Sequence, residues 1–145
     1  RALLDIPFVF AGTGPLEGEI AGVPNIKNVG FQRGQALENL IRQARFSVYP
    51  SQWYENCPFS VMESQLYGTP VLGADIGGIP ELIEPGITGE LFESGNAAQL
   101  EKKIRTLWED RELTDRYSEN CAHLRFDDVA AYTEKLLKLY RGETL

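Results

Sequence analysis

Residues 46–74 read FSVYPSQWYENCPFSVMESQLYGTPVLGA, and this stretch decides the fold. Its first four residues are a short run of strand formers that stops at Pro50. Phe59–Tyr67 is predicted to be a helix, because Gly68 and a following proline form a typical helix stop signal. Pro70–Ala74 is a second apolar run and predicts the next strand. Strand, helix and strand in this order are typical of two parallel strands joined by a crossover helix.

The same alternation continues on both sides of this stretch. Further strands are predicted at Pro7–Ala11, Ile26–Phe31 and Gly89–Phe92, and further helices at Gly34–Arg45 and Ile79–Ile83. After Gly95 the chain is rich in Leu, Lys and Glu, which predicts helices at Asn96–Glu109, Arg111–Cys121 and Asp127–Arg141, with Asn96 and Asp127 as N-caps. We therefore predict an α/β fold in a single domain. It has a Rossmann-like parallel sheet with helices on both faces over residues 1–95, and a helical C-terminal tail over 96–145.

Composition limits the kinds of function. The chain has 145 residues and a formal net charge of -7, which argues against nucleic acid as a partner because nucleic-acid binding needs a basic face. A small anionic ligand stays compatible, since backbone amides can hold a phosphate locally. The two cysteines, Cys57 and Cys121, form no CxxC motif, so we expect packing residues in a reducing, cytoplasmic compartment. No apolar run approaches the roughly 20 residues of a membrane span.

The chain opens RALLDIPFVFAG, without an initiator methionine and with a strand almost at once. We expect a fragment or a processed product. A helix before that strand is represented, at most, by Arg1 to Leu4.

Two glutamates, Glu55 and Glu63, lie around the start of the predicted helix with seven residues between them. At about 100° per residue, Glu63 falls on one stripe with Phe59, Met62 and Leu66, and we expect this stripe to be buried. The other faces hold Ser60, Ser64 and Gln65. A carboxylate on a buried face needs hydrogen-bond donors, and the two hydroxyls of a ribose are suitable donors.

Glu55 lies near the carboxyl end of the strand that precedes the helix, where ligands of open parallel sheets bind. The backbone N–H groups of Phe59, Ser60 and Val61 begin the helix and would face a phosphate there. Against this stands the simpler interpretation that both glutamates are ordinary surface residues, which their spacing alone favours.

The segments VFAGTGPL, NVGF and SVYPS, the glutamate pair, GTPVLGADIGGIPELI and GITGELF follow one another in this order. Together they resemble the C-terminal, nucleotide-sugar-binding half of a GT-B-type retaining glycosyltransferase. The family is the glycosyl transferases group 1, which includes glycogen synthases and many polysaccharide mannosyl- and glucosyltransferases. The resemblance covers about residues 8–110. It implies transfer of a hexosyl group from a nucleotide sugar with retention, and neither a metal nor another cofactor.

The resemblance also assigns residues. It makes Glu55 the candidate catalytic residue, in contact with the transferred sugar, and Glu63 the residue that holds the ribose diol. The other candidate donor-binding residues form several groups. Gly12 and Gly14 match the cleft edge, Val29, Gly30 and Phe31 match the loop beside the base, and Ser51 matches the serine of the family's Pro-Ser element. Asn56, Phe59, Ser60 and Val61 are expected near the sugar and diphosphate, and Gly77 and Gly78 near the acceptor side.

Two departures from the family pattern matter. The family's Gly-Phe-Gly after the first glutamate is here Asn56-Cys57-Pro58, and Pro58 cannot donate an N–H. The family draws a phosphate-binding Arg and Lys from the first strand and helix of this domain, and we expect the core to lack both elements, which would lie upstream of Arg1. Arg33 is expected to be a solvated surface charge. The N-terminal domain that would bind a saccharide or glycolipid acceptor is absent as well. The chain alone is therefore expected to be inactive, and peripheral membrane association of the full-length protein is compatible with the resemblance.

Alternatives from other classes stay open. A GT-B-like epimerase or phosphorylase would share the cleft, and a non-catalytic α/β interaction module would bind no nucleotide. A nicotinamide site at the Gly12–Gly14 run is disfavoured by Pro15 and Glu17. We expect Trp53 and Tyr54 to pack in the core or at its rim. His123 is expected to be structural or exposed. The apolar stripe Val129, Tyr132, Leu136 and Tyr140 packs either on the domain's own sheet or on the missing N-terminal domain.

Overall fold

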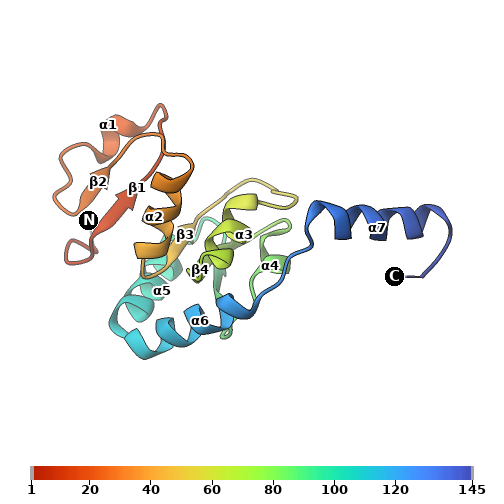
Figure 1. Ribbon diagram of the computed structural model, residues 1–145. Coiled ribbons are helices and arrows are strands. Elements are labelled where there is room, and N and C mark those ends of the chain that lie inside the picture. The colour runs from red at the N-terminus through yellow and green to blue at the C-terminus, as the bar shows by residue number, and fades with distance from the viewer. Residues whose placement is uncertain (1, 145) are drawn as a thin grey trace.

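Strands and helices alternate through most of the computed structural model, which describes residues 2–144 (Figure 1). The strands are β1 (Phe8–Phe10), β2 (Ile26–Asn28), β3 (Ser47–Tyr49), β4 (Val71–Asp75) and β5 (Gly89–Glu93). The helices are α1 (Glu17–Ile20), α2 (Gln35–Gln43), α3 (Phe59–Leu66), α4 (Ile79–Leu82), α5 (Ala97–Glu109), α6 (Arg111–His123) and α7 (Val129–Tyr140). The predicted elements are confirmed within a few residues, and α1 was missed. Arg1 lies outside the described residues.

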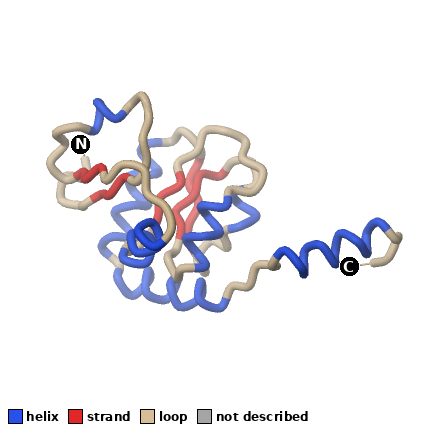
Figure 2. Tube along the Cα trace, turned by 45° about the horizontal axis from the view of Figure 1, so that its top comes forward, coloured by secondary structure: helices blue, strands red, loops and turns tan. Residues whose placement is uncertain are grey.

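All strand pairs are parallel, which confirms the Rossmann-like α/β class. In the larger sheet, β4 lies between β3 and β5, with Val71 opposite Ser47 on one side and Gly89 on the other. In the smaller sheet β1 pairs with β2, and Phe8 lies opposite Ile26. Helices cover the sheets on both sides (Figure 2).

Among the described residues, the five parallel strands are divided between two sheets. The apolar run Pro7–Ala11 would suit a buried strand, but β1 is not buried, since the side chains of Val9 and Phe10 are 55% and 44% exposed. In the part of the chain that the structure describes, β1 is paired along one edge alone, with β2. That the core lacks its first strand stays a prediction, and a strand between β1 and β3 would join the two sheets.

The core is centred on β4. Val71, Leu72 and Ala74 are almost fully buried, as expected for a parallel strand covered on both faces. Side chains from the surrounding helices, from β5 and from the N-terminal segment complete the core: Ile6, Val61, Ile79, Ile83, Phe92, Ile104, Leu107 and Tyr117. Burial of these apolar side chains is the main force that holds the larger sheet to its helices.

Helix α3 buries a polar face, contrary to the prediction. Its buried residues are Val61, Ser64 and Gln65. The Ser64 hydroxyl lies 2.7 Å from the Ser47 hydroxyl on β3 and donates to the Thr69 carbonyl at 3.1 Å. The Gln65 amide donates to the Leu82 carbonyl at 2.8 Å. These hydrogen bonds offset part of the cost of burying polar side chains and attach α3 to β3 and to the end of α4, while the Gln65 Oε1 is buried without a partner among the described residues.

The helical tail divides into a packed part and a projecting part. Asn96 caps α5 by accepting from the Gln99 N–H at 3.0 Å, as predicted. The cap of α7 is Asp128, which accepts from the Ala131 N–H at 2.8 Å, so the prediction of Asp127 is wrong. Helix α7 extends away from the rest of the molecule in both views, and none of its residues is buried (Figures 1 and 2). The alternative that α7 packs on the domain's own sheet is therefore excluded.

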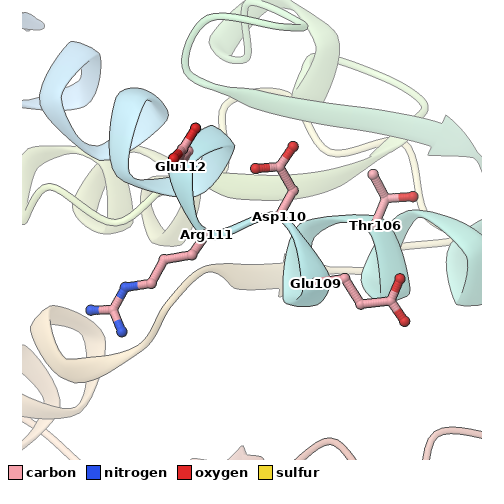
Figure 3. A pocket seen from close by; sticks show the side chains of 5 residues that line it. All are labelled: Thr106, Glu109, Asp110, Arg111 and Glu112. Carbon is pink, nitrogen blue, oxygen red and sulfur yellow. The ribbon is translucent and has the colours of Figure 1, made fainter.

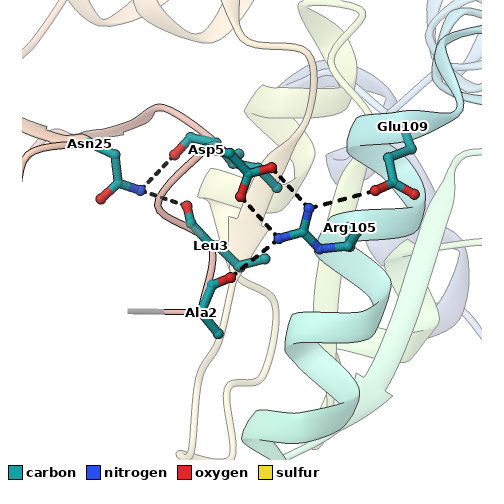
Figure 4. A network of polar contacts seen from close by, with 7 residues as sticks. Ala2, Leu3, Asp5, Asn25, Arg105 and Glu109 are labelled. Carbon is teal, nitrogen blue, oxygen red and sulfur yellow. Dashed lines mark hydrogen bonds and ion pairs between the residues drawn. The ribbon is translucent and has the colours of Figure 1, made fainter.

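The N-terminal segment is tied to α5 by polar contacts (Figure 4). The Arg105 guanidinium contacts both carboxylate oxygens of Asp5, at 2.9 and 3.0 Å, and donates to the Ala2 carbonyl at 3.2 Å. Hydrogen bonding to Arg105 holds the pKa of Asp5 below its usual value. Asn25 donates to the Leu3 carbonyl at 2.8 Å. These contacts position the start of β1 and β2. In the described residues, no helix is long and apolar enough to span a membrane.

We predict that Ser64→Ala lowers the free energy of unfolding by roughly 1–3 kcal/mol, because it leaves buried partners on β3 and at Thr69 unsatisfied. Ser60→Ala is the matched control. Ser60 lies on the same helix, is exposed, and should change stability by less than about 0.5 kcal/mol. Urea unfolding followed by circular dichroism measures both. Equal effects of the two substitutions would contradict the role given to Ser64.

Candidate functional site

The loops that follow β3, β4 and β5 meet at one edge of the larger sheet. The three strands are parallel and in register, so their carboxyl ends lie side by side. The loop after β3, residues 50–58, carries Glu55, the loop after β4 carries Gly77 and Gly78, and Ser94 follows β5. The structure therefore brings Ser51, Glu55, Asn56, Gly77 and Gly78 together, five of the residues that the sequence singled out.

Gly77 and Gly78 lie directly against the backbone of the Glu55 loop. The Gly78 N–H donates to the Glu55 carbonyl at 2.7 Å. A side chain at Gly77 would place its Cβ 2.5 Å from the same carbonyl oxygen, and one at Gly78 would overlap the Asn56 carbonyl. The sequence placed these glycines near a bound donor, and the structure shows what they contact in the chain itself.

Ser94 is a residue that sequence reasoning missed. Its hydroxyl donates to the Ser51 carbonyl at 3.0 Å, which ties the start of the Glu55 loop to the end of β5. The Ser51 hydroxyl also accepts from the Trp53 N–H at 3.2 Å. The available signal was position, because Ser94 is a small polar residue just after a predicted strand, at the edge where the other candidates lie.

The buried position predicted for Glu63 is wrong. Glu63 is exposed, and so are Phe59 and Leu66 of the same stripe, at 75% and 52%. The helical wheel grouped these residues correctly, but the opposite face of α3 points inward because Ser64 and Gln65 find hydrogen-bond partners there. The Glu63 carboxylate accepts no hydrogen bond from a residue in the range 2–144 and is open to solvent.

The first turn of α3 offers fewer free amides than predicted. Pro58 precedes the helix as its N-cap, and the Val61 N–H donates to the Pro58 carbonyl at 3.0 Å. Val61 is also buried in the core, so it is not available to a phosphate. Phe59 and Ser60 are exposed, and their N–H groups find no backbone acceptor among the described residues.

The remaining candidates form a second cluster, at the carboxyl ends of β1 and β2. The Gly12 N–H donates to the Gly30 carbonyl at 2.8 Å, and the Val29 N–H donates to the Phe10 carbonyl at 2.9 Å. The Gly14 N–H donates to the Glu17 carboxylate at 3.0 Å. Phe31 is 72% exposed beside these loops. Within residues 2–144 no hydrogen bond links this cluster to the Glu55 loop.

Several side chains near the site are more exposed than expected. Trp53 and Tyr54 are 79% and 87% exposed, so their predicted packing in the core is wrong. Cys57 is exposed as well, with its sulfur 3.6 Å from the Met62 sulfur, and it is no packing residue. The loop turns these side chains outward because its backbone, rather than its side chains, is held by the neighbouring strand ends. Arg33 and His123 are exposed, as predicted.

Two hollows lie away from the candidate site. A shallow depression at the junction of α5 and α6 is lined by Thr106, Glu109, Asp110, Arg111 and Glu112, whose side chains point in different directions (Figure 3). Asp110 is used there as the cap of α6. A hollow of about 260 Å³ between the smaller sheet and α5 is lined mainly by apolar residues such as Phe8, Phe10 and Leu100. Among the described residues, no group of three or more His, Cys, Asp or Glu is placed to hold a metal ion.

The sequence profile of the family described as "Glycosyl transferases group 1" matches residues 3–123. The chain belongs to this family. Group 1 members are enzymes, and the match covers all five strands and the first six helices of the fold. This membership confirms the resemblance stated from the motifs.

Named relatives agree with the family. An alpha-D-kanosaminyltransferase of Streptomyces kanamyceticus is 26% identical over 94% of this chain and 38% of its own length. A sulfoquinovosyl transferase of Arabidopsis thaliana is 36% identical over 73% of this chain and 22% of its own length. Anabaena HepE, solved in complex with UDP-glucose, is 25% identical, with a TM-score of 0.80 and coverage of 97% of this chain and 43% of that chain. The chain thus spans less than half the length of these relatives.

We predict that Cys57 reacts with a maleimide in the folded protein and that Cys121 does not. Cys57 is exposed, whereas burial raises the pKa of the Cys121 thiol to about 11 and reduces its reactive thiolate. Mass spectrometry of peptides from protein labelled at pH 8, with and without denaturant, measures both sites. Cys57→Ser should abolish labelling of this segment in the native state, and native labelling of Cys121 would contradict its buried position.

Proposed function

We propose that this chain is the donor-binding half of a glycosyltransferase. The enzyme would transfer a hexosyl group from a nucleotide sugar, with retention at the anomeric carbon, to a saccharide or lipid-linked acceptor bound by another domain. The convergence of the loops after β3, β4 and β5 on Glu55 supports this most directly, because open parallel sheets bind ligands at the carboxyl ends of their strands. The names of the relatives, and the UDP-glucose in HepE, support a nucleotide sugar as the donor.

Glu55 is proposed to contact the transferred sugar. Its backbone is fixed by hydrogen bonds on both sides, from its own N–H to the Trp53 carbonyl at 2.9 Å and from the Gly78 N–H to its carbonyl at 2.7 Å. Its carboxylate accepts no hydrogen bond from the chain in the part that the structure describes, so it is free to accept from sugar hydroxyls. A charged acceptor forms stronger hydrogen bonds than a neutral one and would fix the orientation of the hexose.

Glu63 is proposed to accept from the two ribose hydroxyls. Its exposure removes the argument from burial, but it leaves the carboxylate accessible on the outer face of a helix whose inner face is fixed. Glu63 lies one helical turn beyond Phe59, which begins α3. A nucleotide whose diphosphate lies at the first turn of α3 could therefore reach Glu63 with its ribose.

The diphosphate is proposed to lie at the N-terminus of α3, near the free N–H groups of Phe59 and Ser60. Such amides and the helix dipole stabilise a negative charge there. We propose no metal cofactor, and the remaining neutralisation would come from basic residues outside this chain. The net charge of -7 agrees with a contribution from basic residues outside this chain, because the chain by itself offers little attraction to an anionic donor.

Two substitutions test the roles of the glutamates in the full-length protein. Titration calorimetry with UDP, GDP and ADP identifies the base, and the matching nucleotide sugar is titrated next. Glu63→Gln should weaken binding of the nucleotide about tenfold or more, since a hydrogen bond to a charged group contributes about 1.5–3 kcal/mol. Glu55→Gln should weaken binding of the nucleotide sugar by a similar factor and binding of the bare nucleotide by less than about twofold.

Glu119→Gln is the matched control, because Glu119 is exposed on α6 and lies outside the candidate site. It should bind both ligands as the wild type does. Unchanged nucleotide affinity in Glu63→Gln would contradict its assignment to the ribose. Absence of binding by any nucleotide would favour the interaction module over the transferase.

A further inference from the structure

We propose that Gly78 and Ser94 are positioning residues, which hold the loop over residues 50–58 so that Glu55 keeps one orientation toward the donor sugar. The inference rests on the proposed function. It deepens that function, because it assigns sugar recognition to contacts among three strand ends rather than to Glu55 alone.

The orientation of Glu55 is determined by its backbone. Its side chain is half-buried and accepts no hydrogen bond from residues 2–144. Both of its backbone polar groups are bonded, the N–H to Trp53 and the carbonyl to Gly78. The two peptide planes on either side of the Glu55 Cα are therefore fixed, and they set the direction of the bond from Cα to Cβ.

Gly78 is a glycine because of close approach and not because of its conformation. Its φ of -85° and ψ of 0° are available to any residue. It is buried, however, and a Cβ would overlap the Asn56 carbonyl oxygen and lie 2.9 Å from the Asn56 carbonyl carbon. Any side chain at this position must push the peptide between Asn56 and Cys57 away from its place, and the shift pulls the adjacent Glu55 carbonyl off its hydrogen bond with the Gly78 N–H.

Ser94 holds the other end of the same loop. Its hydroxyl donates to the Ser51 carbonyl at 3.0 Å, four residues before Glu55. The loop is thus attached to β4 through Gly78 and to β5 through Ser94. A loop attached at two points, near its start and near its middle, loses much of the backbone freedom that its length would otherwise give.

The hydrogen bonds from Gly78 and Ser94 should affect recognition of the donor sugar and leave the affinity for the bare nucleotide unchanged. Glu55 is the residue proposed to touch the hexose. A displacement of about 1 Å of a group that positions a substrate can lower the reaction rate about a hundredfold. Glu63 lies on α3, which is held separately by Ser64 and Gln65. Pro58, which lies between the Glu55 loop and α3, is buried, so we expect a shift of the loop to be absorbed before the part of the helix that carries Glu63.

The test measures the affinities of the full-length protein for the nucleotide sugar and for its bare nucleotide, in four variants. These are wild type, Gly78→Ala, Glu55→Ala and the double variant. Gly78→Ala should weaken binding of the nucleotide sugar about tenfold or more and change the affinity for the bare nucleotide by less than about twofold. In the Glu55→Ala background, Gly78→Ala should have no further effect, because the group it positions is gone.

Gly18→Ala is the matched control. Gly18 lies in α1, has open space around its missing Cβ, and should leave both affinities unchanged. Ser94→Ala is the milder second variant, measured in the same cycle in case Gly78→Ala does not fold, and Ser94→Thr, which keeps a hydroxyl, should restore wild-type affinity.

An equal loss for both ligands, or an undiminished loss in the Glu55→Ala background, would overturn the positioning role. Failure of the proposed function would give a different result, because the wild-type protein would then bind no nucleotide sugar.

Discussion

The parallel pairing of β4 with β3 and β5 is the constraint on which the candidate site depends. Val71 lies opposite both Ser47 and Gly89, so the three strands run in one direction and release their loops at one edge. Burial of β4 on both faces stabilises this arrangement. The backbone of β4 also lies so close to Gly89 that a Cβ there would overlap the Val71 carbonyl. Convergence of the loops is therefore a consequence of the core, and it needs no contribution from a ligand.

The sequence predicted the elements at this edge well, because strands and helices are marked by local signals. Apolar runs stopped by Pro50 and Gly68 located β3, α3 and the start of β4. The sequence did not predict correctly which face of α3 points into the core. A helical wheel shows which residues share a face, but it assigns the apolar face to the core. The Ser64 hydroxyl and the Gln65 amide nitrogen have hydrogen-bond partners at Ser47 and Leu82, and partners distant in the chain leave no local signal.

Segments at the two ends of the molecule show a different limit of prediction. β1 and α7 both carry apolar side chains, and the pattern identified each element correctly. Their apolar side chains are nevertheless exposed, as for Val9 at 55% and Val129 at 85%. Periodicity indicates that an element has an apolar face, whereas the identity of the surface that covers it depends on other segments.

A single short segment relates the two glutamates to each other. At its start, the Gly78 N–H holds the Glu55 carbonyl, and at its end the Leu82 carbonyl accepts from Gln65 on the inner face of α3, the helix that carries Glu63. Glu55 and Glu63 are thus fixed against the same few residues, although one lies in a loop and the other on a helix. This common attachment gives a physical reason for the glutamate pair and the GGIPEL segment to occur in one chain. Each glutamate can contact a different part of one ligand only if the distance between them is fixed, and the segment after β4 fixes it.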